Sequence, residues 1–208
     1  ICGYDVVRDT AAVRSLIGIV FGGERGLYSR LTARANLEFW AALYGLRGTA
    51  ATRRVDALIE RLGLTARADE AVETFSRGMK QRVHLARGLI GDPRVVILDE
   101  PTTGMDPVAA ADFRELVTSL RVEGRTLLIT THDMAEAEAI CDRVTLIDSG
   151  SVLATERPST LGSWITRYAR VSASGIPDDA ISQVTAAVME VDGVAEVRLT
   201  SPGALLVD

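Results

Sequence analysis

The stretch RVVILDE, Arg94–Glu100, is apolar from Val95 to Leu98 and ends in two adjacent carboxylates. An uninterrupted apolar run of this length is typical of a strand buried on both faces of a parallel sheet. Such sheets bind ligands at the carboxyl ends of their strands, which places Asp99 and Glu100 at a ligand-binding edge. One carboxylate can then reach a Mg²⁺ shell, often through water, while its neighbour faces an attacking water molecule. A buried strand that simply stops at solvent is the alternative, and this feature alone leaves both open.

The tripeptide Ser76-Arg77-Gly78 stands directly before a helical stretch that runs from Met79 to about residue 90. A small hydroxyl, a glycine and the free amides of a helix N-terminus together make a site for phosphate oxygens. The alternative is an ordinary helix cap, because serine begins many helices.

His132 follows the apolar stretch TLLITT, residues 126–131, which predicts a second strand. An imidazole at the carboxyl edge of a sheet can hydrogen-bond a terminal phosphate and the water that attacks it. A histidine at a strand end is otherwise usually a solvated residue. Between the two strands, Asp106 and Pro107 predict the start of a helix, since a carboxylate caps a helix and proline suits its first turn.

The alternation of strands and helices predicts an α/β fold with a mostly parallel sheet between helical layers. Apolar residues at helical spacing predict two amphipathic helices within a helical region at about residues 30–70, and Thr32 can cap the first of them. Their stripes comprise Leu37, Trp40, Ala41 and Tyr44, and then Val55, Leu58, Ile59 and Leu62. Ser149 and Gly150 predict a hairpin turn. We expect one domain over residues 1–160 and a small, truncated α+β accessory domain over residues 161–208.

Composition excludes several classes of protein. The chain has 208 residues, 47% of them hydrophobic, which is enough for a core and argues against disorder. The net charge of -5 argues against a nucleic-acid surface. The sequence shows no run of roughly 18 apolar residues that would predict a membrane-spanning helix, so a membrane role requires a partner. Two distant cysteines favour a reducing compartment.

Ser76, Asp99, Glu100, Asp106 and His132 occur in the order and at the intervals of one known family. The chain resembles the ATP-binding subunit of ABC transporters, whose fold is a P-loop NTPase-like cassette. FSRGMKQR resembles the signature motif, VVILDE the Walker B motif, TTGMD the D-loop and THD the switch-histidine segment. The resemblance covers residues 1–160, and residues 22–46 are similar to exporters of the drug-resistance and sodium-extrusion groups.

The resemblance implies ATP and Mg²⁺ as cofactors and gives each motif a role. Asp99 would hold Mg²⁺ through water, Glu100 would polarise the attacking water, and His132 would sense the γ-phosphate. The signature and D-loop residues would serve the ATP of a second cassette, because two cassettes enclose two nucleotides head to tail in this family. These residues are Ser76, Arg77, Gly78, Met79 and Asp106.

The same resemblance implies the partners and the location. A transmembrane permease subunit and a second ATP-binding cassette, in a homodimer or a heterodimer, are the expected partners, and nucleic acid is not. The subunit would lie at the cytoplasmic face of the cell membrane as a peripheral protein.

Three departures from the family pattern affect these expectations. In the signature, Phe75, Arg77 and Met79 replace the common Leu, Gly and Gln. At the Q-loop the usual glutamine falls at Gly22 or Gly23, so that Glu24 is the substitute we expect, and Gly23 and Glu24 are candidate nucleotide-site residues.

The third departure concerns the Walker A loop. Lys80 is the only lysine and already belongs to the signature segment, so no lysine remains for a phosphate-binding loop. That loop should precede Ile1, and we expect the cassette to be incomplete at its N-terminus. The 208 residues alone are therefore expected to bind ATP weakly and to be inactive.

Two other functions stay open. One is a soluble ABC-type ATPase of DNA repair or translation, although the coiled coils, zinc insertions or second cassette of such proteins do not appear in the sequence. The other is a pseudo-cassette that acts only as a binding or regulatory module. A phosphate-binding loop encoded upstream of Ile1 would separate the second from the transporter.

Overall fold

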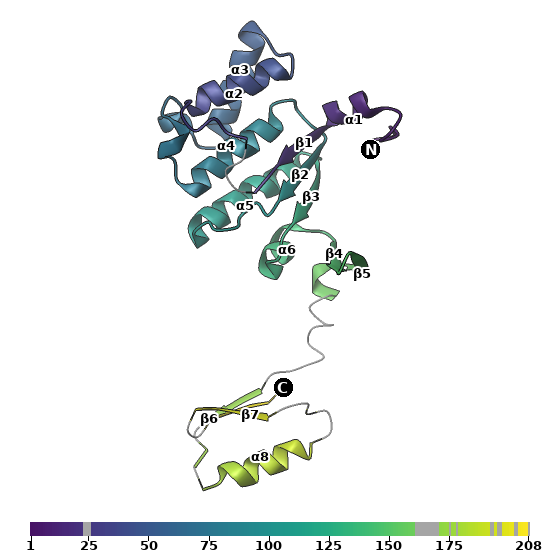
Figure 1. The fold of residues 1–208 in the computed structure, drawn as a ribbon, viewed down its shortest axis with the longest axis vertical. Coiled ribbons are helices and arrows are strands. Elements are labelled where there is room, and N and C mark those ends of the chain that lie inside the picture. Colours follow the sequence, from purple (N-terminus) through teal and green to yellow (C-terminus); the bar gives the residue numbers. More distant parts are fainter. Residues whose placement is uncertain are drawn as a thin grey trace. The chain divides into compact units, whose positions relative to one another are not determined.

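The computed structural model describes residues 1–22, 26–160, 171–174, 176–177, 179–191, 194, 197–201 and 204–207. Its contacts divide the chain into two units, Ile1–Ile140 and Cys141–Asp208 (Figure 1). The predicted domain boundary at residue 160 stays a prediction. In the described part of the chain, none of the helices combines the length and the apolar character that crossing a bilayer requires.

The first unit is built on a parallel sheet in the order β1-β2-β3. Its strands are β1 (Ile17–Val20), β2 (Val95–Asp99) and β3 (Thr126–Thr130). Val20, Val96 and Leu98 are fully buried, so the apolar run of β2 forms core as predicted. The register pairs Asp99 with Thr130, which brings the ends of β2 and β3 to the same edge.

The helices of this unit pack on the sheet or on one another (Figure 1). They are α1 (Thr10–Leu16), α2 (Ala33–Leu43), α3 (Gly48–Arg61), α4 (Arg77–Leu89), α5 (Pro107–Val122) and α6 (Met134–Ile140), with 3₁₀ turns at Thr65–Arg67 and Val72–Thr74. Helix α4 lies directly on β1, where a Cβ on Gly18 would stand 2.1 Å from the carbonyl oxygen of Gly88. Only glycine at position 18 permits this approach.

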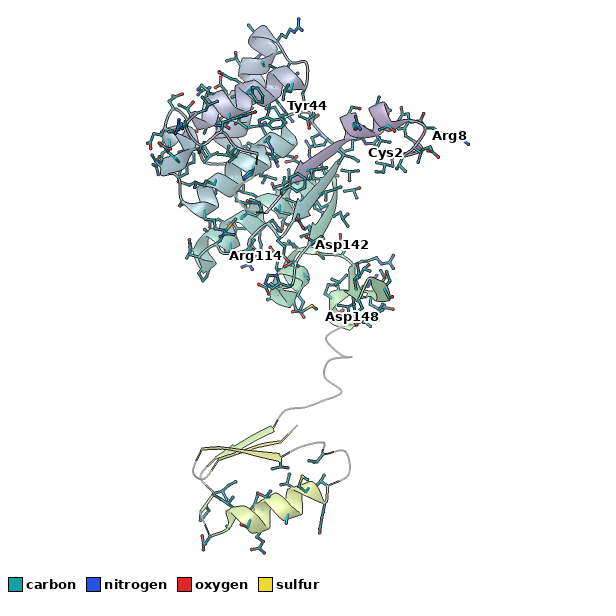
Figure 2. All side chains as sticks on the ribbon, in the orientation of Figure 1. Cys2, Arg8, Tyr44, Arg114, Asp142 and Asp148 are labelled. Atoms are coloured by element: carbon teal, nitrogen blue, oxygen red, sulfur yellow. The ribbon has the colours of Figure 1, made fainter. Side chains whose placement is uncertain are left out.

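The two predicted amphipathic helices are α2 and α3. The predicted Thr32 cap is confirmed by a 3.0 Å hydrogen bond that the Ala35 amide donates to the Thr32 hydroxyl. The whole stripe of α3 is buried. In α2, Leu37 and Ala41 are buried, whereas Trp40 and Tyr44, the residue that follows the helix, line a cavity instead of the core. Figure 2 shows the position of Tyr44.

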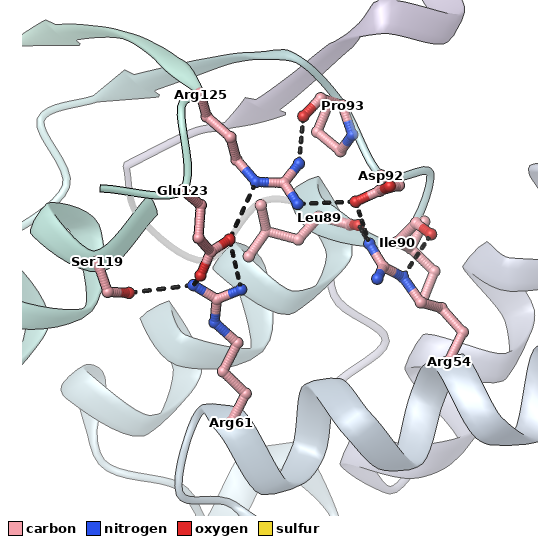
Figure 3. A network of polar contacts seen from close by, with 9 residues as sticks. All are labelled: Arg54, Arg61, Leu89, Ile90, Asp92, Pro93, Ser119, Glu123 and Arg125. Carbon is pink, nitrogen blue, oxygen red and sulfur yellow. Dashed lines mark hydrogen bonds and ion pairs between the residues drawn. The ribbon is translucent and has the colours of Figure 1, made fainter. Parts of the chain in front are cut away.

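A network of arginines and carboxylates joins α3 to the ends of α4 and α5 (Figure 3). Arg54 donates to the carbonyl oxygens of Leu89, at 2.5 Å, and Ile90, at 3.2 Å. Arg61 bonds Glu123 with two nitrogens, at 2.5 and 3.1 Å. Arg125, in turn, donates to Asp92 at 2.7 Å, and Asp92 also accepts from Arg54 at 3.2 Å.

The second unit begins with an antiparallel hairpin of β4 (Val144–Asp148) and β5 (Ser151–Glu156). Ser149 and Gly150 adopt positive φ values of 47° and 77° in the turn, which confirms the predicted hairpin. The strands β6 (Val171–Ser174), β7 (Val197–Ser201) and β8 (Ala204–Val207) form an antiparallel sheet in the order β6-β8-β7, and α8 (Ile181–Met189) contacts β7. The expected α+β composition is thus confirmed for the described residues, while residues 161–170 lie outside them.

Candidate functional site

The acidic pair lies where β2 ends, as predicted, but only Asp99 belongs to the strand. Glu100 has φ +47°, in the left-handed region that non-glycine residues seldom adopt. Its amide donates to the carbonyl oxygen and the hydroxyl of Thr130, at 3.0 and 3.1 Å. The Thr130 hydroxyl donates to Asp99 at 2.6 Å. One threonine of β3 therefore holds both acidic residues at this edge, and the unusual backbone of Glu100 is of the kind found at functional sites.

His132 contacts Glu100 directly. Its Nδ1 lies 2.8 Å from Oε2 and 3.0 Å from Oε1 of Glu100. The residue stands two positions beyond β3 and not on its last position, and its side chain is 75% exposed. Glu100 also accepts a 2.7 Å hydrogen bond from the Thr103 hydroxyl. The structure thus brings together the two residues that we predicted to be catalytic.

Charge and hydrogen bonding shift the pKa values of this pair in opposite directions. The hydrogen bond from His132 lowers the pKa of Glu100 below its ordinary value, and the bond from Thr103 acts in the same direction. The pKa of His132 is raised by its hydrogen bond to Glu100 and by the negative charges of Glu100, Asp133 and Glu136. The arrangement keeps an ionised carboxylate beside an imidazole that tends to hold its proton.

The Ser76 motif caps α4, as the simpler interpretation expects, because the Met79 amide donates to the Ser76 hydroxyl at 3.3 Å. Gly78 lets this turn pack against α5, since a Cβ on Gly78 would stand 3.1 Å from the Cβ of Ala109. Ser76 and Arg77 are exposed, so the cap leaves the motif open to a ligand. A phosphate role for these residues stays a prediction.

The loop between β2 and α5 lies beside that motif. Asp106 caps α5 through a 2.9 Å hydrogen bond from the Ala109 amide, as predicted. Gly104 has φ +72°, and a Cβ there would stand 2.7 Å from the guanidinium carbon of Arg77. Arg77 therefore lies against Gly104, and the two predicted motifs are neighbours within one chain.

Gly22 follows β1 and lies against the acidic pair, where a Cβ would stand 2.8 Å from the carbonyl oxygen of Asp99. The next predicted site residues, Gly23 and Glu24, lie outside the described residues. Sequence reasoning missed Thr103 and Thr130. Their signal is present but weak, since each is a hydroxyl residue within two to three positions of a predicted catalytic residue.

Known proteins are similar to this chain in sequence and in fold. Residues 3–103 match the ABC transporter family. Over 151 residues the chain is 43% identical to the ABC transporter ATP-binding protein NatA of Bacillus subtilis (strain 168). The aligned residues make up 73% of this chain and 61% of that protein. The matched residues therefore have the sequence of an ABC transporter ATP-binding domain.

Two further proteins are similar to this chain. The linearmycin resistance ATP-binding protein LnrL of Bacillus subtilis is 42% identical over 152 residues, which are 73% of this chain and 49% of that protein. The solved structure of cbiO1 from Clostridium perfringens, part of the ABC transporter complex cbiONQ, matches with a TM-score of 0.68 and 32% identity over 74% of this chain and 61% of that one. The chain thus spans 61% and 49% of the length of the two curated relatives.

Two cavities adjoin the ABC motifs. The larger, of about 800 Å³, lies between β1 and α2 and is lined by Phe21, Trp40, Tyr44 and Arg87 among others. Arg87 is 7% exposed, donates to the Gly26 carbonyl oxygen at 2.8 Å and lies 5.1 Å from the centre of the Trp40 ring. Burial lowers the pKa of Arg87 below its ordinary value.

The smaller cavity, of about 360 Å³, is lined by the D-loop residues Thr102–Met105 and by His132. Arg114 of α5 also lines it (Figure 2). His132 and Arg114 can donate hydrogen bonds to phosphate oxygens, and Asp133 adds a carboxylate to the same lining.

The acidic pair fits the Mg²⁺ that the ABC family implies. Within the described ranges, no three His, Cys, Asp or Glu side chains form a metal-holding group. Mg²⁺ does not require such a group, because it keeps several waters and binds through one or two carboxylates together with phosphates. Asp99, exposed at the end of β2 and held in place by Thr130, provides such a carboxylate.

Proposed function

We propose that this chain forms the ATP-binding and ATP-hydrolysing part of an ABC export system, in which a separate transmembrane permease carries the cargo. The observation that supports hydrolysis best is the 2.8 Å contact between Glu100 and His132 at the carboxyl edge of the sheet. The names of similar proteins support export, since LnrL is a linearmycin resistance protein and another relative exports Nod factor.

The residues of this edge have distinct roles in the proposal. Asp99 holds Mg²⁺ through water, and bound Mg²⁺ neutralises charge on the phosphate oxygens. Glu100, kept ionised by its lowered pKa, orients and polarises the attacking water. His132 donates a hydrogen bond to the terminal phosphate, for which its raised pKa suits it.

A second cassette completes the site. Ser76, Arg77 and Asp106 are exposed, and we propose that they serve a nucleotide bound by the partner cassette together with Gly78 and Met79. The contact of Arg77 with Gly104 supports this assignment, because it holds the signature turn and the D-loop in one surface.

The proposed permease contact lies in the helical region, at the cytoplasmic face of the membrane. The cavity between β1 and α2 supports it, since Phe21, Tyr44 and Trp40 offer an aromatic surface to a partner helix. By themselves the 208 residues would bind ATP weakly, because the only lysine, Lys80, lies in α4.

Steady-state ATP hydrolysis by the full-length gene product tests this function. We expect Glu100→Gln to lower kcat by about 100-fold or more with little change in ATP binding, because the amide cannot polarise water. Glu115→Gln, on the exposed side of α5, is the matched control and should leave kcat unchanged. Equal kcat in the Glu100→Gln variant and the control would contradict the proposal.

A further inference from the structure

Glu136 is the one acidic residue of the described chain that is buried, at 1% exposed. It stands in α6, three residues after Asp133, whose carboxylate accepts the Ala135 amide at 2.9 Å and caps that helix. A carboxylate inside a protein is unfavourable unless a hydrogen bond compensates for its lost hydration. The Thr102 hydroxyl provides that bond, at 2.7 Å from Oε1 of Glu136.

Thr103, the residue after Thr102, makes a similar hydrogen bond to the predicted catalytic residue Glu100. The Thr103 hydroxyl donates to Glu100 at 2.7 Å, so two adjacent hydroxyls connect Glu136 to Glu100. The turn that carries them is closed by backbone hydrogen bonds from Thr103 to Glu100, at 3.3 Å, and from Met105 to Thr102, at 3.0 Å. A movement of Thr102 is therefore transmitted to the side chain of Glu100.

The two partners of the catalytic contact depend on the same short helix. His132 lies two residues before the start of α6, and the loop that orients Glu100 is attached to α6 through Glu136. We propose that Glu136 is a positioning residue, which holds the loop at Thr102 so that Thr103 keeps Glu100 against His132. The consequence for hydrolysis rests on the proposed function, whereas the positioning of Glu100 against His132 does not.

The charges around His132 are consistent with this positioning. Glu100, Asp133 and Glu136 all raise its pKa, and Arg114 lines the same cavity with the opposite charge. Because the contact with Glu100 is the largest of these influences, the pKa of His132 reports on the position of Glu100.

The test is an NMR titration of His132 in the 208-residue protein, which contains only one other histidine, His84. Thr102→Val removes the hydroxyl while nearly keeping the volume. We expect it to lower the pKa of His132 part of the way toward the value in Glu100→Gln. The amides of Thr103 and Met105 should exchange with solvent about tenfold faster, because their turn loses its attachment. Thr102→Ser should restore both readings.

Thr52→Val is the matched control, because the Thr52 hydroxyl bonds only its own helix, at the Gly48 carbonyl oxygen. It should change neither reading. Thr102→Ala removes the same hydroxyl from a half-buried position and replaces the valine variant if valine prevents folding.

An unchanged His132 titration in Thr102→Val would overturn the inference, even with faster exchange, because the loop would then move without moving Glu100. The titration requires no nucleotide, so the result stands whether or not the protein hydrolyses ATP. If Glu100→Gln abolished hydrolysis while Thr102→Val left the titration unchanged, the proposed function would stand and the positioning role would fail.

Discussion

Glu100 is the first residue after β2, at the edge of the sheet where the candidate site lies. Its left-handed backbone turns the chain away from the direction of β2, and its amide is bonded to both oxygen groups of Thr130. As a result, Asp99 and Glu100 separate into two environments, one on the strand and one facing His132. A period-two strand alone predicts opposite faces for the two carboxylates. It does not predict that the second carboxylate meets a histidine.

The contact between Glu100 and His132 predicts a pH window. The pKa of His132 is raised above 6.5, so its stabilising contribution is complete below 6.5 and is lost as the pH rises through the raised value. The pKa of Glu100 is lowered below 4.5, so its contribution is present above 4.5 and is lost as the pH falls through the lowered value. The contact between Glu100 and His132 is therefore at full strength between pH 4.5 and pH 6.5.

NMR titration of Glu100→Gln measures this window. The pKa of His132 should fall toward its ordinary value of 6.5, because the largest cause of its shift is removed. A histidine that titrated identically in the variant and the wild type would show that the two side chains do not meet in solution.

Among the elements, α3 is attached to the rest of the unit by its buried apolar stripe and also by side chains that the amphipathic pattern does not reveal. Arg54 bonds the last carbonyl groups of α4, and Arg61 reaches Glu123 beyond the end of α5 (Figure 3). The pKa of Glu123 is lowered, first by the bond from Arg61, and that of Asp92 is lowered, first by the bond from Arg125. Both carboxylates are therefore ionised at neutral pH.

Urea denaturation at pH 7 tests the attachment of α3. Arg54→Gln should lower the free energy of unfolding by about 1–2 kcal/mol, because the Ile90 carbonyl oxygen loses this donor and the Leu89 carbonyl oxygen keeps only the Asp92 amide. Arg53→Gln is the matched control, because Arg53 lies on the same helix and donates only to the Thr49 carbonyl oxygen within α3. It should change the free energy of unfolding by less than about 0.5 kcal/mol. Equal effects would show that the network does not stabilise the unit.

The sequence predicts those elements whose signals are local. The apolar run of β2, the caps at Thr32, Ser76 and Asp106 and the Ser149-Gly150 turn each occupy a few consecutive residues, and each is found where it was expected. The sequence does not predict helix α1, because the apolar segment at the end of residues 11–21 indicates only the strand that follows the helix.

The site was predictable only in part. Asp99, Glu100 and His132 were expected at one edge because parallel strands end together, and the structure confirms that Glu100 meets His132. The bond between Thr102 and Glu136 joins residues 34 positions apart, and no sequence pattern indicates such a pairing. The spacing of Trp40 and Tyr44 predicts that they belong to the core, but both line a cavity. Periodicity could not predict this, because it does not show what lies opposite a helix face.

At the scale of the whole molecule, we propose that Glu100 and His132 act as one unit on ATP. The described unit supplies the acidic pair, the histidine, the signature turn and the D-loop on a single sheet edge and its neighbouring loops. The chain spans 61% of NatA, so hydrolysis is a property to be measured on the full-length gene product.

A double-mutant cycle in kcat for ATP hydrolysis tests this claim most directly. Glu100→Gln, His132→Ala and the double variant are compared with the wild type at saturating ATP. Because residues that act together are strongly non-additive, the double variant should be no slower than the slower single variant. If the two losses multiplied, or if either single variant hydrolysed ATP at the wild-type rate, the claim would be contradicted.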